Sequence, residues 1–299
     1  MKKEMAAAAC ATVAMLSAGS SLAFENGISP FPAGSTGEYV GALPPIPGLF
    51  ALEQFHYTTS NGLYDNDGNK RPVPFSLSAS SATTRLLAAY PVTVLGANLY
   101  SQLVIPAVSL RTEVAGHAGK DSGLSNTTVS PAILRWSLTP QASLVAGLDI
   151  ALATGSYSPT RPSVAVGYTS IQPVLAFRQT DPNGLDIGLS NRLLFNRENG
   201  DTHYRSGSGY IAEFTAGWNF GAWKVGVVGA YLNQFRDDEQ RGAVINGNRA
   251  RSFALGPSIE YHAGPISISV NYQRGIYAAN TTKNNILGIG VTIPLWVKN

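Results

Sequence analysis

Residues that could carry out catalysis are few in this sequence and widely separated. The four histidines, His56, His117, His203 and His262, are isolated and show no metal-ligand spacing. The stretch Gly155-Ser156-Tyr157-Ser158-Pro159 lacks the second glycine of a nucleophile elbow. Cys10 is the one cysteine, which leaves neither a disulfide framework nor a cysteine-based metal site. The sequence therefore predicts no enzyme, no metal site and no cofactor.

Charged side chains form the second set with possible chemistry, and they are sparse. They make up 13% of the chain, against about 25% in typical globular domains. The formal net charge is only +3, which argues against a nucleic-acid partner. Several charges stand singly between apolar residues that alternate along the chain. If the apolar residues face lipid, the charges line a lumen, and this predicted lining is Arg85, Arg135, Asp149, Arg178, Asp186, Arg192, Glu213, Lys224 and Glu260.

Two interpretations of this lining stay open. The charges either form a salt-bridged lumen that only holds the shape of the protein, or a polar lining that selects solutes. Arg178 and Asp186 are equidistant from Pro182 across the turn at residues 181–184. They are therefore candidates for an ion pair between adjacent strands.

The elements that would position these charges are β-strands. Apolar residues recur at every second position, as in the stretch from Tyr210 to Phe220, with polar residues between them. This period is that of a strand with one apolar face. Counting such segments predicts an all-β protein of twelve strands, at residues 49–59, 75–90, 94–110, 124–138, 142–153, 168–179, 185–195, 208–220, 223–235, 250–262, 266–273 and 285–297.

The connections between these strands alternate in length. Short turns are expected at residues 91–93, 139–141, 181–184, 221–222 and 263–265. Long polar connections are expected near residues 60–74, 111–123, 154–167, 196–207, 236–249 and 274–284. Short periplasmic turns and long outer loops are typical of outer-membrane barrels. The sequence thus predicts a closed transmembrane antiparallel barrel in which residues 285–297 pair with residues 49–59.

Tryptophan and proline mark particular heights in this barrel. The four tryptophans lie near short turns or the C-terminus and predict a belt at the membrane interface: Trp136, Trp218, Trp223 and Trp296. Four prolines fall inside predicted strands, where the missing N–H breaks the ladder: Pro131, Pro173, Pro257 and Pro294. We expect bulges or kinks at these positions. They either only curve the wall or mark a side opening.

The N-terminal part of the chain divides into two further regions. Residues 1–23 show the pattern of a cleaved signal peptide, with Lys2 and Lys3 before an apolar stretch and Ser21-Leu22-Ala23 at its end. Residues 24–48 are rich in proline and glycine, and are expected to be either a periplasmic tail or a plug in the lumen. Residues 49–299 are expected to form the barrel. The predicted location is the outer membrane of a Gram-negative bacterium.

Short segments along most of the chain resemble a known family. They include Gly41-Ala42-Leu43-Pro44-Pro45, Asp121-Ser122-Gly123-Leu124, Tyr204-Arg205-Ser206-Gly207 and Phe220-Gly221-Ala222-Trp223. In this order they resemble the outer-membrane family named after the MetA pathway of phenol degradation, also called SphA-type proteins.

The resemblance implies a channel for uptake of small hydrophobic or aromatic compounds. Its partners would be the lipid bilayer and such a solute. The alternative that remains is a structural or adhesion barrel with an occluded lumen.

Overall fold

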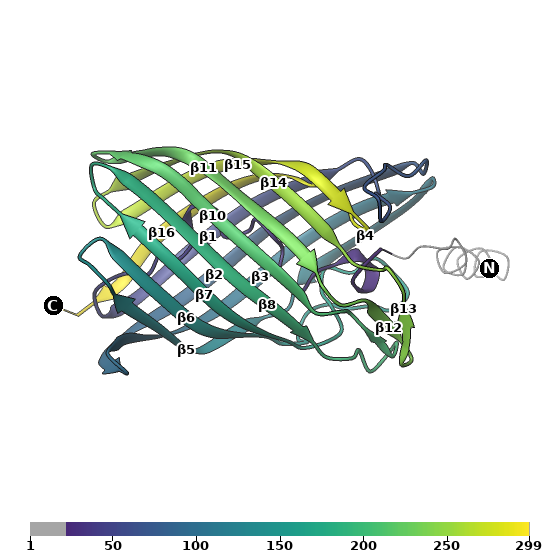
Figure 1. The fold of residues 1–299 in the computed structure, drawn as a ribbon, viewed down its shortest axis with the longest axis horizontal. Coiled ribbons are helices and arrows are strands. Elements are labelled where there is room, and N and C mark those ends of the chain that lie inside the picture. The colour runs from purple at the N-terminus through teal and green to yellow at the C-terminus, as the bar shows by residue number, and fades with distance from the viewer. Residues whose placement is uncertain (1–21, 299) are drawn as a thin grey trace.

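The protein is an antiparallel β-barrel, shown in a computed structural model that describes residues 22–298 (Figure 1). The predicted signal peptide lies outside the described residues, except for its last two positions. The barrel strands are β1 (Gly48–Ser60), β2 (Phe75–Val94), β3 (Ala97–Val114), β5 (Thr128–Ser137), β6 (Ala142–Ala151), β7 (Ser170–Thr180), β8 (Leu185–Asn196), β10 (Gly209–Phe220), β11 (Trp223–Gln234), β14 (Arg251–Ala263), β15 (Ile266–Ala279) and β16 (Asn285–Val297).

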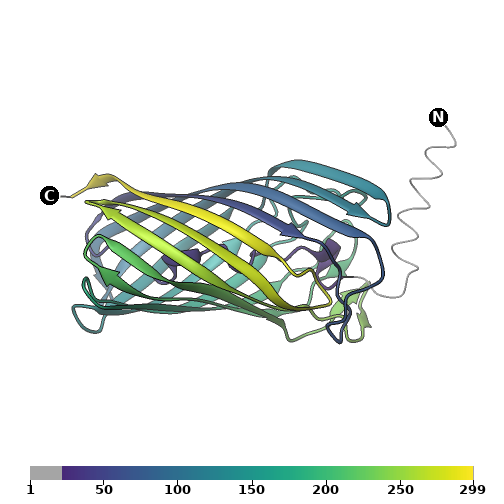
Figure 2. The same ribbon diagram turned by 90° about the horizontal axis from the view of Figure 1, so that it is seen from above.

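These twelve strands close on themselves. Each pairs with its neighbours along the chain, β2 pairs with β3, and β1 pairs with β16. The strands run obliquely along the barrel (Figure 2). Closure leaves no lipid-exposed edge, as a bilayer requires, because hydrocarbon offers no hydrogen-bond partners. The predicted twelve-stranded closed barrel is confirmed.

The two ends of the barrel differ in their connections. At one end, called here the short-turn end, the strands are joined through residues 95–96, 138–141, 181–184, 221–222 and 264–265. At the other, the long-loop end, the connections are longer and include a small sheet of β9 (Tyr204–Arg205), β12 (Asp238–Gln240) and β13 (Ala243–Ile245). No helix within residues 22–298 is long and apolar enough to cross a membrane.

Two predicted connections are wrong, and a third is shorter than expected. Residues 91–93 form no turn, because β2 continues through a register shift between Ala89 and Thr93 to Val94. The turn lies at Leu95 and Gly96, both with positive φ, as a two-residue hairpin requires. The expected loop at 111–123 is instead part of a hairpin. In it, β4 (His117–Leu124) pairs antiparallel with the last part of β3 at the long-loop end (Figure 2). Likewise, β15 runs to Ala279 rather than to residue 273.

The wall has an apolar outer face and a polar inner face. In β8, Leu185, Leu189 and Leu193 are exposed, whereas Asp186 and Arg192 are buried. The same alternation recurs around the barrel, since strand side chains point alternately to opposite faces. An apolar exterior is what lipid stabilises, and the buried polar residues must find partners inside.

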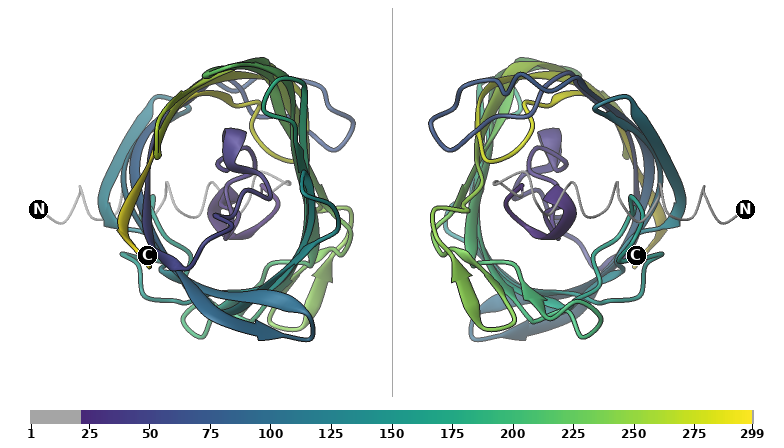
Figure 3. Two further views of the ribbon diagram at one scale, coloured as in Figure 1. Left: turned by 90° about the vertical axis from the view of Figure 1, so that its left-hand side faces the viewer. Right: turned by 90° about the vertical axis from the view of Figure 1, so that its right-hand side faces the viewer.

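Residues 22–47, called here the N-terminal segment, lie inside the barrel (Figure 3). The segment leads from the long-loop end, where the Ala23 amide donates to the Asn280 carbonyl, to the start of β1 at the short-turn end. It contains two single-turn 3-10 helices, Glu25–Gly27 and Gly37–Tyr39. Gly34 has φ 94°, and a Cβ there would lie 2.8 Å from the Gln273 side chain. The close passage along the wall thus requires glycine.

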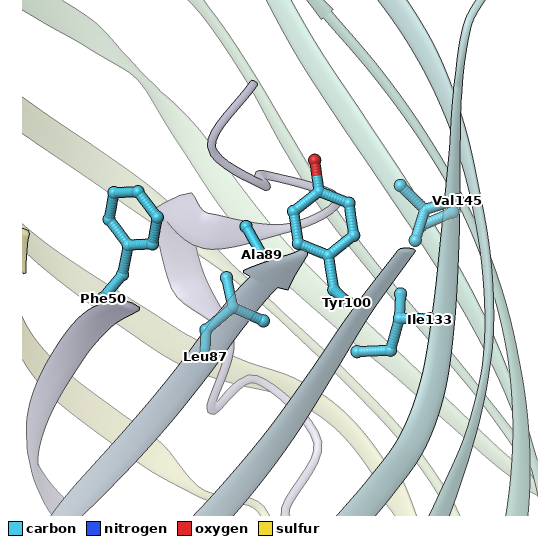
Figure 4. Close-up of a cluster of buried hydrophobic side chains, with 7 residues drawn as sticks. Phe50, Leu87, Ala89, Tyr100, Ile133 and Val145 are labelled. Atoms are coloured by element: carbon cyan, nitrogen blue, oxygen red, sulfur yellow. The ribbon is translucent and has the colours of Figure 1, made fainter. Parts of the chain in front are cut away.

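An apolar cluster lies inside the barrel near the short-turn end (Figure 4). Its members come from six strands and pack against Leu43 of the N-terminal segment: Phe50, Leu87, Ala89, Tyr100, Ile133, Val145 and Ala176. The Tyr100 hydroxyl donates to the Pro44 carbonyl at 2.7 Å. This cluster holds the end of the segment that leads into β1.

Candidate lumen site

The most buried charges of the wall form a network with the N-terminal segment. Lys224 Nζ lies 2.6 Å from Glu38 Oε2 and 3.0 Å from Asp186 Oδ1. Arg178 lies 2.7 Å from Asp186 and donates to the carbonyls of Glu38 and Val40. The Lys224 and Glu38 side chains are fully buried. The segment thus supplies a carboxylate and two carbonyls to two wall cations.

A second charged group lies between β6 and β8. Arg192 Nη1 is 2.7 Å from Asp149 Oδ2 and 2.7 Å from Gln172 Oε1. Asp149 also accepts from Ser130 and, at 3.4 Å, from Gln102. The Arg192 guanidinium carbon lies 3.9 Å from the centre of the Phe31 ring, a cation–π contact with the N-terminal segment. Every oxygen of Asp149 is therefore occupied.

Glu213 holds the middle of the N-terminal segment by hydrogen bonds. Its carboxylate accepts from the Gly34 amide at 2.8 Å, the Thr36 amide at 3.1 Å and the Thr36 hydroxyl. From β1 and β15, Gln54 and Gln273 donate to carbonyls of the segment, at Ser35 and Gly34. A buried polar backbone is stable only with such partners.

A cavity of about 440 Å³ remains between the segment and the wall. Its apolar lining includes Phe31, Val104, Pro106, Val108 and Leu110. Its charged lining is Arg85, Asp149 and Arg192. This volume is within the range of pockets that bind small organic molecules.

The structure places the other predicted lining residues as follows. Arg85 lines the cavity, and its Nε donates to Gln102 at 2.5 Å. Arg135 lies near the short-turn end and donates to Ser137 at 3.0 Å. Glu260 is buried, 3.9 Å from His262. These two residues are not part of the cavity lining.

The predicted tryptophan belt residues lie at the short-turn end. Trp218 and Trp223 flank the turn at residues 221–222 and are each 49% exposed. Trp136 donates to the Leu95 carbonyl in the neighbouring turn. Trp296 is 59% exposed near the end of β16.

The four strand prolines interrupt ladders in two ways. At Pro131 the register shifts against both β3 and β6, and a shift also occurs beside Pro294. Pro173 and Pro257 leave gaps in the pairing with β8 and β15 without a change of register. Pro131 and Ala132 are both exposed, so the bulge at Pro131 puts two consecutive residues on the outer face.

The long-loop end holds the beginning of the N-terminal segment. Buried Asp238 accepts from the Phe24 amide, Tyr204, Gly207, Gln234 and Asn248. Burial raises the pKa of the Asp238 carboxyl above its ordinary value. Glu25 accepts from Tyr157, Asn199 and Thr202, and burial, with the Glu25 charge next, raises the pKa of Tyr157. Residues 24 and 25 are thus hydrogen-bonded to three loops of the long-loop end.

Sequence reasoning missed Glu38, Asp238 and the glutamines that hold the segment. Glu38 stands in a proline- and glycine-rich stretch with no periodicity, so the sequence did not indicate where its side chain points. Because Glu38 is also far from Lys224 in sequence, their contact could not be predicted. Four glycines of that stretch, Gly27, Gly34, Gly37 and Gly41, have positive φ, and their spacing was the one available signal of a folded segment. Among residues 22–298, no group of three or more acidic, histidine or cysteine residues could hold a metal ion.

The barrel is similar to solved outer-membrane proteins. The COG4313 outer membrane channel from Pseudomonas putida F1 superposes with a TM-score of 0.75 at 17% identity, covering 86% of this chain and 97% of that one. The β-domain of the Bordetella autotransporter BrkA gives 0.50 at 13% identity, covering 83% and 100%. These likenesses establish the fold of an outer-membrane β-barrel.

Sequence comparison gives the family. No curated protein matches the chain. One family model does match, over residues 60–289 of the 299, and its description is "Putative MetA-pathway of phenol degradation". The match agrees with the resemblance found in the sequence and with a non-enzymatic membrane barrel. Because it spans well over half of the protein, the chain belongs to this family of phenol-degradation MetA-pathway proteins.

Proposed function

We propose that the protein is an outer-membrane channel for the uptake of small hydrophobic or aromatic compounds. The observation that carries the proposal is the cavity between the N-terminal segment and the wall. It is largely apolar, and its volume of about 440 Å³ suits a small organic molecule. The segment lies inside the lumen, so the barrel does not resemble a wide aqueous pore.

The proposal includes the path of the solute. An apolar molecule that leaves the cavity is stabilised by about 25 cal/mol per Å² when it enters lipid rather than water. The bulge at Pro131 interrupts the ladder on both sides and is the best candidate for a side opening. We further propose that residues 1–23 are removed on export and that the short-turn end faces the periplasm.

Uptake by whole cells tests the function. Gram-negative cells producing the protein are compared with cells that lack it, using 2-naphthalenemethanol as a neutral aromatic probe and arabinose as a hydrophilic one. We expect faster initial uptake of the aromatic probe and unchanged uptake of arabinose. Calorimetry of the protein in lipid nanodiscs should show binding of the aromatic probe.

Two results would contradict the proposal. Fast uptake of arabinose without binding of the aromatic probe would indicate a general porin. If neither solute were taken up or bound, the protein would be a structural or adhesion barrel, the alternative that an occupied lumen also allows.

A further inference from the structure

Arg85 is a cation of the lumen without an acidic partner. It lies in the middle of β2, opposite Leu52 of β1 and Val104 of β3. Within residues 22–298 its guanidinium has one hydrogen-bond partner, the neutral Gln102 side chain, and forms no ion pair. Arg85 is one of the residues that line the cavity. A cation taken out of water without a partner is costly, so a ligand that supplies the opposite charge is favoured there.

The nearby carboxylate does not meet this need. Asp149 gives one oxygen to Arg192 at 2.7 Å and the other to Ser130 and Gln102. The charged residues that line the cavity are therefore two arginines and one aspartate. Asp149 neutralises the charge of Arg192, and within the described part of the chain the cavity lining contains no second carboxylate that could neutralise Arg85.

The rest of the lining can hold an apolar body. Val104, Pro106, Val108 and Leu110 follow one another on the inner face of β3, starting opposite Arg85. Phe31 of the N-terminal segment also lines the cavity. A charged head at Arg85 and an apolar body along β3 can therefore be bound together.

We propose that the cavity binds amphipathic carboxylic acids, with the carboxylate on Arg85 and the apolar body against β3 and Phe31. This inference rests on the proposed function, because it names the class of solute that the same cavity takes. The shared chemistry is a carboxylate on an apolar body, either aromatic or aliphatic. A guanidinium presents two parallel N–H donors to a carboxylate, which gives the head group both charge and geometry.

Matched ligands test the proposal in the full-length protein in lipid nanodiscs. The aromatic pair is 2-naphthoate and 2-naphthalenemethanol, and the aliphatic pair is decanoate and decanol. Calorimetry gives the affinity of each for the wild type and for Arg85→Gln, Arg85→Lys and Arg135→Gln. Arg135→Gln removes an equal charge from the inner wall outside the cavity. The heat-modifiable mobility of each variant in gels shows that its barrel is folded.

We expect Arg85→Gln to weaken 2-naphthoate binding about tenfold, as for the loss of a charged hydrogen bond. Binding of the matched alcohol should stay within about twofold, because its apolar contacts are kept. Arg85→Lys should bind 2-naphthoate more tightly than Arg85→Gln but less tightly than the wild type. Lysine keeps the positive charge but lacks the two parallel N–H donors of a guanidinium. The aliphatic pair shows whether the body must be aromatic.

Three outcomes separate the possible failures. Equal binding of acid and alcohol, unaffected by Arg85→Gln, overturns the role of Arg85 and leaves the channel function standing. An equal loss in Arg85→Gln and Arg135→Gln overturns it too, because only the general potential of the lumen then matters. If the wild type binds neither aromatic ligand, the proposed function itself fails.

Discussion

Lys224 joins the wall of the barrel to the N-terminal segment. Its ammonium contacts Glu38 of the segment at 2.6 Å and Asp186 of β8 at 3.0 Å, and its side chain is fully buried. Asp186 retains Arg178 as a second cation. Among the described residues, the Glu38 carboxylate retains one neutral donor, the Thr215 hydroxyl at 2.7 Å from Oε2, and its Oε1 has no hydrogen-bond partner. Removing the lysine therefore leaves Glu38 as a buried charge without a counterion.

We predict that Lys224→Met lowers the free energy of unfolding by about 3–5 kcal/mol, the usual cost of breaking a buried ion pair from one side. Tryptophan fluorescence during urea unfolding of the micelle-embedded protein measures this change. Lys298→Met is the matched control, because Lys298 is exposed at the end of the chain. Adding Glu38→Leu to Lys224→Met should recover part of the loss. A loss below about 1 kcal/mol, as for a surface ion pair, would contradict this account.

Individual residues differ in how far the sequence could place them. Arg178 and Asp186 are close in sequence across a turn, so parity and turn position alone suggested their pairing. In the structure they occupy diagonal ladder positions and their charged groups are 2.7 Å apart. Glu38 and Lys224 are separated by 186 positions. Nothing local in the sequence relates them, because their contact depends on how the segment enters the lumen.

At the scale of the strands, the prolines divide by what they do to the ladder. Pro131 shifts the register against both neighbouring strands, whereas Pro173 leaves the register of its neighbours unchanged. A bulge twists and loosens the wall more than a single missing hydrogen bond. The difference gives the proposed side opening a matched control within the same barrel.

We predict that Pro131→Val slows the uptake of 2-naphthalenemethanol, because an added N–H lets the ladder close across the bulge. The free energy of unfolding of the same variant should rise by about 0.5–1.5 kcal/mol, which is the net contribution of one hydrogen bond. Pro173→Val should leave uptake close to that of the wild type. Cell uptake and urea unfolding measure the two effects. Equal uptake by wild type and both variants would mean that the prolines only curve the wall.

Strand positions followed from the sequence wherever the apolar alternation was unbroken. Turns were harder to place. Pro91 suggested a turn, but the β-branched residues Val92, Thr93 and Val94 continue β2, and Leu95 takes the positive φ. The hairpin of β3 and β4 was also missed, because it projects at the long-loop end and its strands have no apolar lipid-facing side.

For the whole molecule, the lumen contents decide the permeability. A barrel of twelve strands lies between eight-stranded barrels, filled by side chains, and sixteen-stranded barrels, which hold water. Here the N-terminal segment lies inside the lumen, and a cavity of about 440 Å³ remains between it and the wall. Its contacts with Lys224, Glu213 and Asp238 hold it at three points along its length, at Glu38, Gly34 and Phe24.

We predict that deleting residues 24–46 raises the single-channel conductance of the barrel in planar bilayers, because water and ions then fill the lumen. Thr36→Val is the control: it removes one hydroxyl contact with Glu213 but keeps the segment and its other anchors. Its conductance should match the wild type. If the deletion variant conducts no better while remaining folded, the segment does not limit passage.

The passage of the N-terminal segment through the lumen also determines where the chain ends. Twelve strands alone would return the chain to the side on which it started, but the segment adds one more crossing. Residue 23 therefore lies at the long-loop end and residue 298 at the short-turn end. In an outer membrane with short turns toward the periplasm, the two ends of the described chain belong to different compartments. An epitope tag joined near residue 24 should therefore bind an antibody added to intact cells. The same tag placed after residue 298 should not bind that antibody unless the cells are opened.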